Sequence, residues 1–238
     1  AEHLGLDLEG RNTRWILVAG TNGKGSTVAF LAAIMEAVGH RVGRYTSPHL
    51  VDVSERIQVN SEPIDSEAFV AHGVAALASA EESGVDLTYF EVVTLIALLH
   101  FQQRCVDIGV LEVGLGGRLD ATNIVSPSLA ILTTIGMDHM EFLGDSLAQI
   151  AWEKGGITRP GVPLVTGLPL PLHRASLRGR DEPANTWRTG EEFSLLEDGD
   201  GLVYRSSVGV RRDLRLGFEG AHQLHNGGLA IAGAEILE

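Results

Sequence analysis

The chain has 238 residues, of which 18 are Lys or Arg and 31 are Asp or Glu, so its formal net charge is −13. Because nucleic acids and anionic membranes bind basic surfaces, this charge argues against both as partners. The longest apolar run, residues 92–99, is far shorter than the ~20 residues of a membrane-spanning helix. No signal peptide is visible, and the single cysteine fits a reducing compartment. We therefore expect a cytoplasmic monomer in which Cys105 is a buried structural thiol.

Apolar runs alternate with helical patterns over most of the chain, which indicates an α/β fold with a mostly parallel sheet and helices on both faces. The apolar runs predict strands over residues 15–19, 41–46, 106–113, 129–135 and 163–166. The helical patterns predict helices over residues 25–38, 66–82, 89–104 and 145–154. The third of these helices begins with the capping-box pair Thr88 and Glu91.

The chain changes in character after residue 190. The stretch FSLLEDGDGLVYRSS, residues 193–207, places a turn-forming Asp-Gly-Asp-Gly between two strand-like runs, and a third strand candidate follows at 212–218. These patterns predict a small antiparallel β addition over residues 191–218. The preceding residues 174–187 are the most polar of the chain, and we expect a loop there. The last residues, 223–238, begin an apolar-faced helix.

A glycine-rich segment, VAGTNGKGST at residues 18–27, joins the first expected strand to the first expected helix. The amides at a helix N-terminus attract a phosphate, and Lys24 would contact the terminal phosphates of a nucleotide. The spacing differs from the usual triphosphate loop, because Gly25 stands between Lys24 and Ser26. A generic glycine turn is the alternative. We expect the nucleotide to bind at Thr21, Asn22, Gly23, Lys24, Gly25, Ser26 and Thr27.

Three further side chains follow expected strands at the edge where open α/β sheets place their ligands. Glu112 ends one apolar strand, while Ser47 and His139 follow two others. A buried carboxylate is costly without a cation, and this donor set suits Mg²⁺ beside ATP. For each residue alone, a strand-end cap or a backbone-bonded histidine is an equal alternative.

The segment VAGTNGKGST resembles the ATP loop of the Mur ligase superfamily, and the glycine between Lys24 and Ser26 resembles its folylpolyglutamate and dihydrofolate synthase branch. Four further segments agree in order: GRYTSPHLVDVSERIQVNSEPI, LEVGLGGRLDATNIV, TTIGMDHMEFLGDSLAQIAWEKGGI and GAHQLHNGGLAI. The resemblance implies the nucleotide-binding central domain of that superfamily. It also implies an ATP-dependent ligase that adds L-glutamate to a folate or dihydropteroate carboxylate through an acyl phosphate.

The resemblance implies roles for particular residues. It assigns Mg²⁺ to Ser47, Glu112 and His139, and catalytic roles to Lys24, Lys154 and His139. The lysine that matches Lys154 is carbamylated in the family and helps to hold a second Mg²⁺. The helical pattern alone predicts a snorkelling lysine at this position, on the same stripe as Ile150.

The resemblance also implies which residues lie near the substrate and near the adenine of ATP. The substrate loops match Pro48, His49 and Arg56, and then Asp120, Ala121 and Asn123. Asp120 and Asn123 could equally be turn formers. The loop departs from the family at Val53 and Ser54, which leaves the details of the pocket open. Gln223 and Asn226 match residues at the adenine and the hinge, whereas we interpret His222 and His225 as loop residues and not as metal ligands.

Relatives carry a further C-terminal domain that completes the ATP and glutamate sites. We therefore expect residues 1–222 to form the ATPase domain and residues 223–238 to begin a hinge helix towards that domain. On this interpretation, these 238 residues alone bind ATP weakly and form little amide product. Two alternatives stay open: another Mur-type ligase that acts on cell-wall precursors, and a nucleotide-binding module without catalysis.

Overall fold

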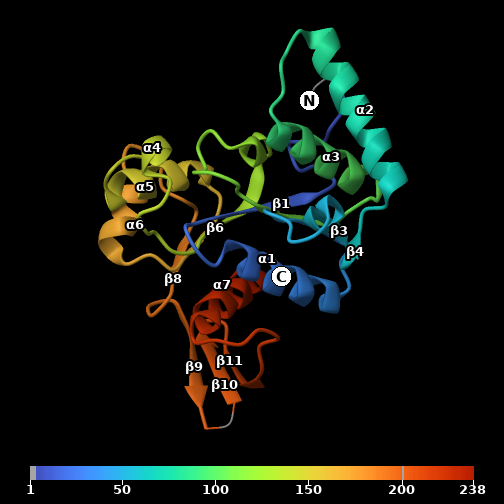
Figure 1. Cartoon of the computed structure of the whole chain (residues 1–238). Coiled ribbons are helices and arrows are strands. Elements are labelled where there is room, and N and C mark those ends of the chain that lie inside the picture. The colour runs from blue at the N-terminus through green and yellow to red at the C-terminus, as the bar shows by residue number, and fades with distance from the viewer. Residues whose placement is uncertain (1–3, 200) are drawn as a thin grey trace.

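The computed structural model describes residues 4–199 and 201–238, and its centre is an eight-stranded sheet (Figure 1). The strand order is β4-β3-β2-β5-β1-β6-β7-β8, and all neighbours are parallel except β2 with β3 and β3 with β4. The strands are β1 (Arg14–Ala19), β2 (Val42–Tyr45), β3 (Ile57–Val59), β4 (Glu62–Pro63), β5 (Ile108–Glu112), β6 (Pro127–Leu132), β7 (Leu164–Thr166) and β8 (Thr186–Arg188). The predicted α/β class with a mostly parallel sheet is confirmed.

Both faces of the sheet are covered, so β1 is apolar at every core position, as buried parallel strands are. Ile16 and Val18 pack with α1 and α7 on one face, while Leu17 and Ala19 pack with α3 on the other. The helices are α1 (Lys24–Val38), α2 (Ser66–Ser83), α3 (Tyr89–Gln103), α4 (Met140–Leu143), α5 (Leu147–Lys154), α6 (Leu170–Ser176) and α7 (His222–Leu237). Within the described residues, no helix is long and apolar enough to span a membrane.

A second sheet confirms the predicted antiparallel β addition. Its strands are β9 (Phe193–Asp198), β10 (Gly201–Ser206) and β11 (Val210–Leu214), and it lies beside α7 (Figure 1). Asp200 of the expected turn lies outside the described residues. The carboxylate of Glu235 on α7 anchors the sheet, because it accepts hydrogen bonds from Tyr204, Ser206 and Arg211.

Several predicted boundaries are wrong for identifiable reasons. The expected strand 129–135 stops at Leu132, because the hydroxyls of Thr133 and Thr134 turn to donate to the phosphate-loop carbonyl of Asn22. The expected loop 174–187 contains the end of α6 and most of β8, a short edge strand with too few residues to show a period. Strand β11 ends at Leu214, before the predicted limit of 218.

Cys105 is also placed differently from expectation. It is exposed and not buried, because α3 ends at Gln103 and Cys105 adopts φ 50° in the turn that follows. The chain turns there towards β5, so the thiol points away from the core that the helix covers.

Acid stability is expected to depend on one buried histidine. His100 on α3 is only 2% exposed, and neither of its ring nitrogens has a hydrogen-bond partner among the described residues. Burial lowers its pKa from 6.5 to about 4. The pKa is lower in the folded chain, so stability is complete above pH ~6.5 and falls as the pH drops, by up to about 3 kcal/mol below pH 4. His100→Leu should flatten this dependence in urea unfolding at several pH values. The exposed control His222→Gln should keep it; equal slopes in all three proteins would contradict the assignment.

Candidate active site

The phosphate-type loop lies between β1 and α1, and its backbone leaves helix amides free. Gly23 occupies the N-cap position of α1 with φ 83°, in the left-handed region, and no side chain caps the helix within the described residues. Because the first amides of a helix have no intrahelical acceptor, they are available to an anion. The local structure therefore supplies the half-positive end that the sequence predicts.

Neighbouring groups approach the loop too closely for side chains at its glycines. A Cβ on Gly20 would collide with the Thr133 hydroxyl, and a Cβ on Gly23 would collide with the Asn226 amide. At Gly25, the glycine that interrupts the usual spacing, a Cβ would lie 3.3 Å from a carboxylate oxygen of Glu112. The unusual glycine therefore lets the acid approach the helix N-terminus.

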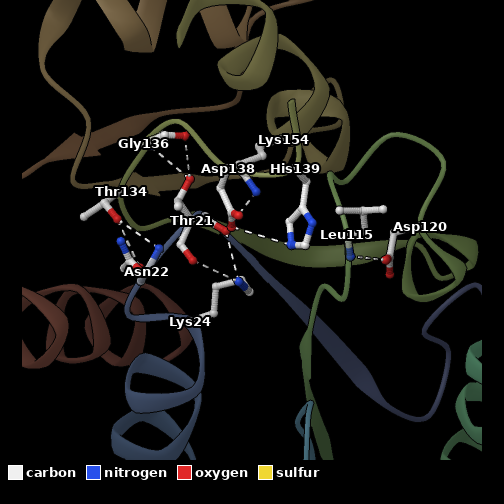
Figure 2. A network of polar contacts seen from close by, with 11 residues as sticks. Thr21, Asn22, Lys24, Leu115, Asp120, Thr134, Gly136, Asp138, His139 and Lys154 are labelled. Atoms are coloured by element: carbon white, nitrogen blue, oxygen red, sulfur yellow. Dashed lines mark hydrogen bonds and ion pairs between the residues drawn. The ribbon is translucent and has the colours of Figure 1, made fainter. Parts of the chain in front are cut away.

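Two ammonium groups converge on one carbonyl oxygen. Nζ of Lys24 donates to the oxygen of Gly20 over 3.1 Å and to that of Thr21 over 3.2 Å, while Nζ of Lys154 donates to Gly20 over 3.0 Å (Figure 2). They are the only lysines in the chain. Lys154 is 4% exposed, and burial, reinforced by repulsion from Lys24, lowers its pKa to about 8. Two cations held on neutral carbonyls form a site for an anion.

Glu112 and Ser47 meet at the ends of β5 and β2. The backbone amide of Ser47 donates to Oε2 of Glu112 over 3.1 Å, and Glu112 is 5% exposed. Burial raises the pKa of the Glu112 carboxyl, while the Ser47 amide and the charge of Lys24 act in the opposite direction. A buried carboxylate with one hydrogen bond retains acceptor capacity for a cation.

His139 faces another carboxylate, that of Asp138. It adopts φ 47° at the start of α4, and its Nε2 lies 3.6 Å from Oδ2 of Asp138 (Figure 2). Among the described residues, no group of three or more His, Cys, Asp or Glu gathers to hold a metal. Mg²⁺ commonly uses one or two carboxylates together with phosphate oxygens and waters, so Glu112 with Ser47 fits that donor set.

A cleft of about 440 Å³ joins the phosphate loop to the two loops predicted to bind substrate. It is lined by Lys24, Ser47, Pro48, Arg56, Phe90, Gly114, Leu115, Asp120 and His139. The structure thus brings residues of the nucleotide, metal and substrate predictions to one surface. Phe90 and Leu115 give this surface an apolar part.

The loop after β2 is held by its own charged residues. The carboxylate of Glu55 accepts the amides of Leu50, Val51 and Asp52, and these hydrogen bonds lower its pKa. The next residue, Arg56, donates Nε to Nδ1 of His49 over 2.9 Å. The predicted substrate residues His49 and Arg56 therefore contact each other directly.

The loop after β5 combines both alternatives that the sequence left open. Asp120 accepts hydrogen bonds from the amides of Leu115 and Thr122 as a turn former does, yet it also lines the cleft. The amide of Asn123 donates to the carbonyls of Arg118 and Gly156, so its polar groups hold the loop together. Ala121 is half-buried beside it.

The N-terminal turn of α7 packs against the phosphate loop. Nε2 of Gln223 donates to Oγ of Ser26 over 3.3 Å, and Asn226 donates to Gln223 over 2.9 Å. Thr27 is fully buried and its hydroxyl has no partner among the described residues, so Ser26 is the hydroxyl that faces neighbouring groups. On the other side of the loop, Thr21 and Asn22 are bonded to the segment after β6 (Figure 2).

The sequence did not single out Phe90 and Leu115, which line the cleft, or Asp138, which lies next to the cleft residue His139. Asp138 faces both His139 and Lys154, and it acts to raise the pKa of Lys154. Its position directly before His139 was the available signal. Phe90 and Leu115 gave no signal, because isolated apolar residues beside a helix start or a glycine turn are indistinguishable from core residues.

Gly23→Ala is expected to weaken nucleotide binding. Alanine is strained at the φ of 83° that Gly23 adopts. Its Cβ would also displace Asn226, which moves α7 away from the loop. Titration with a fluorescent ATP analogue should show at least ~10-fold weaker binding, or about 1.4 kcal/mol. Gly39→Ala is the matched control, because Gly39 has φ 109° but open space around it; similar losses in both variants would refute the contact.

Comparisons with known proteins agree with this geometry. Residues 18–162 match the family described as Mur ligase middle domain. The dihydrofolate synthase/folylpolyglutamate synthase of Bacillus subtilis is 38% identical over 239 residues, which cover 92% of this chain and 54% of the relative. The structure of E. coli FolC in complex with DHPP and ADP superposes with a TM-score of 0.89 at 35% identity, covering 99% of this chain and 55% of that one.

A structure of an FPGS–AMPPCP–folate complex has a TM-score of 0.87 at 34% identity and covers 99% of this chain and 60% of that one. The chain thus spans little more than half the length of these relatives. With a family match over more than half of its residues, the chain belongs to the Mur ligase family, and its relatives there are folylpolyglutamate and dihydrofolate synthases.

Proposed function

We propose that this chain is the ATP-binding part of a ligase that joins L-glutamate to the carboxylate of a folate or dihydropteroate. The observation that carries the proposal is the convergence of Lys24 and Lys154 on the Gly20 carbonyl, beside free helix amides and a buried acid. The solved complexes of relatives, one with DHPP and ADP and one with AMPPCP and folate, support an adenine nucleotide and a folate-type acceptor for this chain as well.

The reaction needs charge neutralisation more than a protein nucleophile. The γ-phosphoryl of ATP passes to the substrate carboxylate and gives an acyl phosphate and ADP. The amine of glutamate then attacks the acyl carbon, loses a proton and displaces phosphate. Lys24 and the first amides of α1 would balance the charge that moves between the phosphoryl oxygens.

Mg²⁺ fits the residues at the end of β5. Glu112 would hold the ion together with the Ser47 hydroxyl, and Gly25 leaves the acid room beside the helix start. His139 lines the same cleft and is the proposed third protein ligand. When bound, the ion would neutralise phosphate charge.

Lys154 is suited to carbamylation, which requires an uncharged amine. With a pKa of about 8, about a tenth of Lys154 is uncharged at pH 7, far more than of an exposed lysine. The modification would turn a cation that repels Lys24 into an anion. We propose it here together with a second Mg²⁺.

The proposal includes the division into domains, the oligomeric state and the cellular compartment. Residues 1–222 would form the ATPase domain and residues 223–238 the helix that leads to a glutamate-binding domain. Gln223 and Asn226 would lie near the adenine. We also propose a monomer that works in the cytoplasm. A cell-wall ligase or a module without catalysis is less well supported, because the relatives above are folate enzymes.

The central test is carboxylate-dependent release of ADP by the naturally expressed protein. Release should require Mg²⁺ and glutamate, and it should occur with dihydropteroate, a reduced folate or both, with the amide product seen by mass spectrometry. Turnover only with a cell-wall precursor, or none with any carboxylate, would refute the proposal. ATP titration of the 238 residues alone, with and without Mg²⁺, should show weak binding.

Amine labelling offers a test that needs no turnover. Because Lys24 and Lys154 are the only lysines, acetylation reports these two amines and the N-terminus. MgATP should slow the acetylation of Lys24 several-fold and leave the N-terminal amine unchanged as the internal control. Equal rates with and without MgATP would place the nucleotide elsewhere.

Lys154→Arg should abolish ligation without unfolding the chain. Arginine keeps the positive charge but is never neutral at accessible pH, so it cannot be carbamylated. We expect kcat to fall at least ~100-fold, which is about 2.7 kcal/mol. Circular dichroism should show an intact fold, and full activity in this variant would exclude a carbamate at this position.

A further inference from the structure

Trp152 on α5 lies two residues before Lys154 and has a guanidinium over its ring from each of two segments. The Cζ atom of Arg118 is 5.0 Å from the ring centroid, and that of Arg180 is 4.7 Å away. Arg118 comes from the loop after β5, and Arg180 comes from the segment after α6. Such cation–π contacts are directional, so the ring orients both arginines.

Both arginines also bind the end of α5 itself. Arg118 forms a bidentate pair with Glu153, with N···O distances of 3.2 and 3.0 Å, and its backbone amide donates to the Glu153 carbonyl over 3.0 Å. Arg180 donates to the carbonyls of Trp152 and Gly155. The last turn of α5 is therefore fastened on two sides.

The two backbones meet without room for side chains. A Cβ on Gly117 would lie 2.7 Å from the carbonyl oxygen of Lys154, and a Cβ on Gly156 would collide with the backbone of Arg118. The loop and the helix end thus fit in one relative position.

The junction, where the loop after β5 meets the end of α5, lies between two parts of the cleft. Lys154 reaches from it to the Gly20 carbonyl of the phosphate loop. Asp120, two residues after Arg118, reaches the cleft from the other side. Two further hollows, of about 370 and 400 Å³, share residues 118–121 as a wall. The loop that Arg118 anchors therefore shapes the cavity away from the nucleotide.

We propose that Arg118 is a positioning residue: by pairing with Glu153 and stacking on Trp152, it holds the Asp120 loop in register with Lys154 and sets the fit of the carboxylate substrate, not of the nucleotide. The inference rests on the proposed function. The Arg118–Glu153 pair is partly exposed, and such pairs contribute little to stability, so its purpose is geometric.

Kinetics of matched variants test this role. Arg118→Gln should raise the KM for the folate-type substrate about 10-fold and leave the KM for ATP within about 2-fold, because misplacement affects only the loop's side of the cleft. Arg118→Lys should fail to rescue it, since lysine lacks the planar fork. Trp152→Phe should retain function, whereas Trp152→Leu should resemble Arg118→Gln. The control Arg174→Gln removes an exposed charge on α6 and should change neither KM.

Hydrogen exchange provides a readout that is independent of ligation. In Arg118→Gln, amides of residues 114–121 should exchange faster, while those of residues 20–27 should not change. Unchanged exchange in the loop, or a parallel rise of both KM values, would overturn the inference. If the unmodified protein ligates no folate-type substrate, the proposed function fails, and the exchange result still decides whether Arg118 holds the loop.

Discussion

The whole site depends on how closely other chain segments approach the phosphate-type loop. Three glycines of this loop lie where a Cβ would meet Thr133, Asn226 or Glu112. Because Thr133 directly follows β6, Asn226 lies on α7 and Glu112 ends β5, the loop is enclosed by the sheet edge on one side and by the last helix on the other. That enclosure places two lysines on the Gly20 carbonyl and brings the carboxylate of Glu112 beside Gly25 in the first turn of α1.

The electrostatics follow from this packing. Burial destabilises the charged forms of both Glu112 and Lys154, and Lys24 acts on each of them, in favour of the acid and against the other lysine. Two ammonium groups on neutral carbonyls favour an anion, and a buried carboxylate that accepts the Ser47 amide favours a cation. The magnesium nucleotide proposed above would supply both charges at once.

Chain segments also approach closely on the side of the cleft where we expect the substrate, at Gly117 and Gly156. There, the backbone of the loop after β5 lies directly against the end of α5, whose Lys154 bonds the Gly20 carbonyl of the phosphate-type loop. Arg118, Trp152 and Arg180 add directional contacts to this junction. The cleft is thus a set of loops tied to rigid elements, as precise positioning requires.

The sequence alone determined the alternation of strands and helices, the parallel sheet, the antiparallel addition and the glycine loop with Lys24. These features are local: apolar period, capping pairs and glycine spacing are properties of neighbouring residues. Glu112, Ser47 and His139 could be named because parallel strands end at a common edge. Only the tertiary structure decided that Lys154 shares a carbonyl with Lys24, that Asp138 faces Lys154 and that Cys105 is exposed. The contact of Lys154 with Gly20 joins residues 134 positions apart, and no local pattern records a distance across the fold.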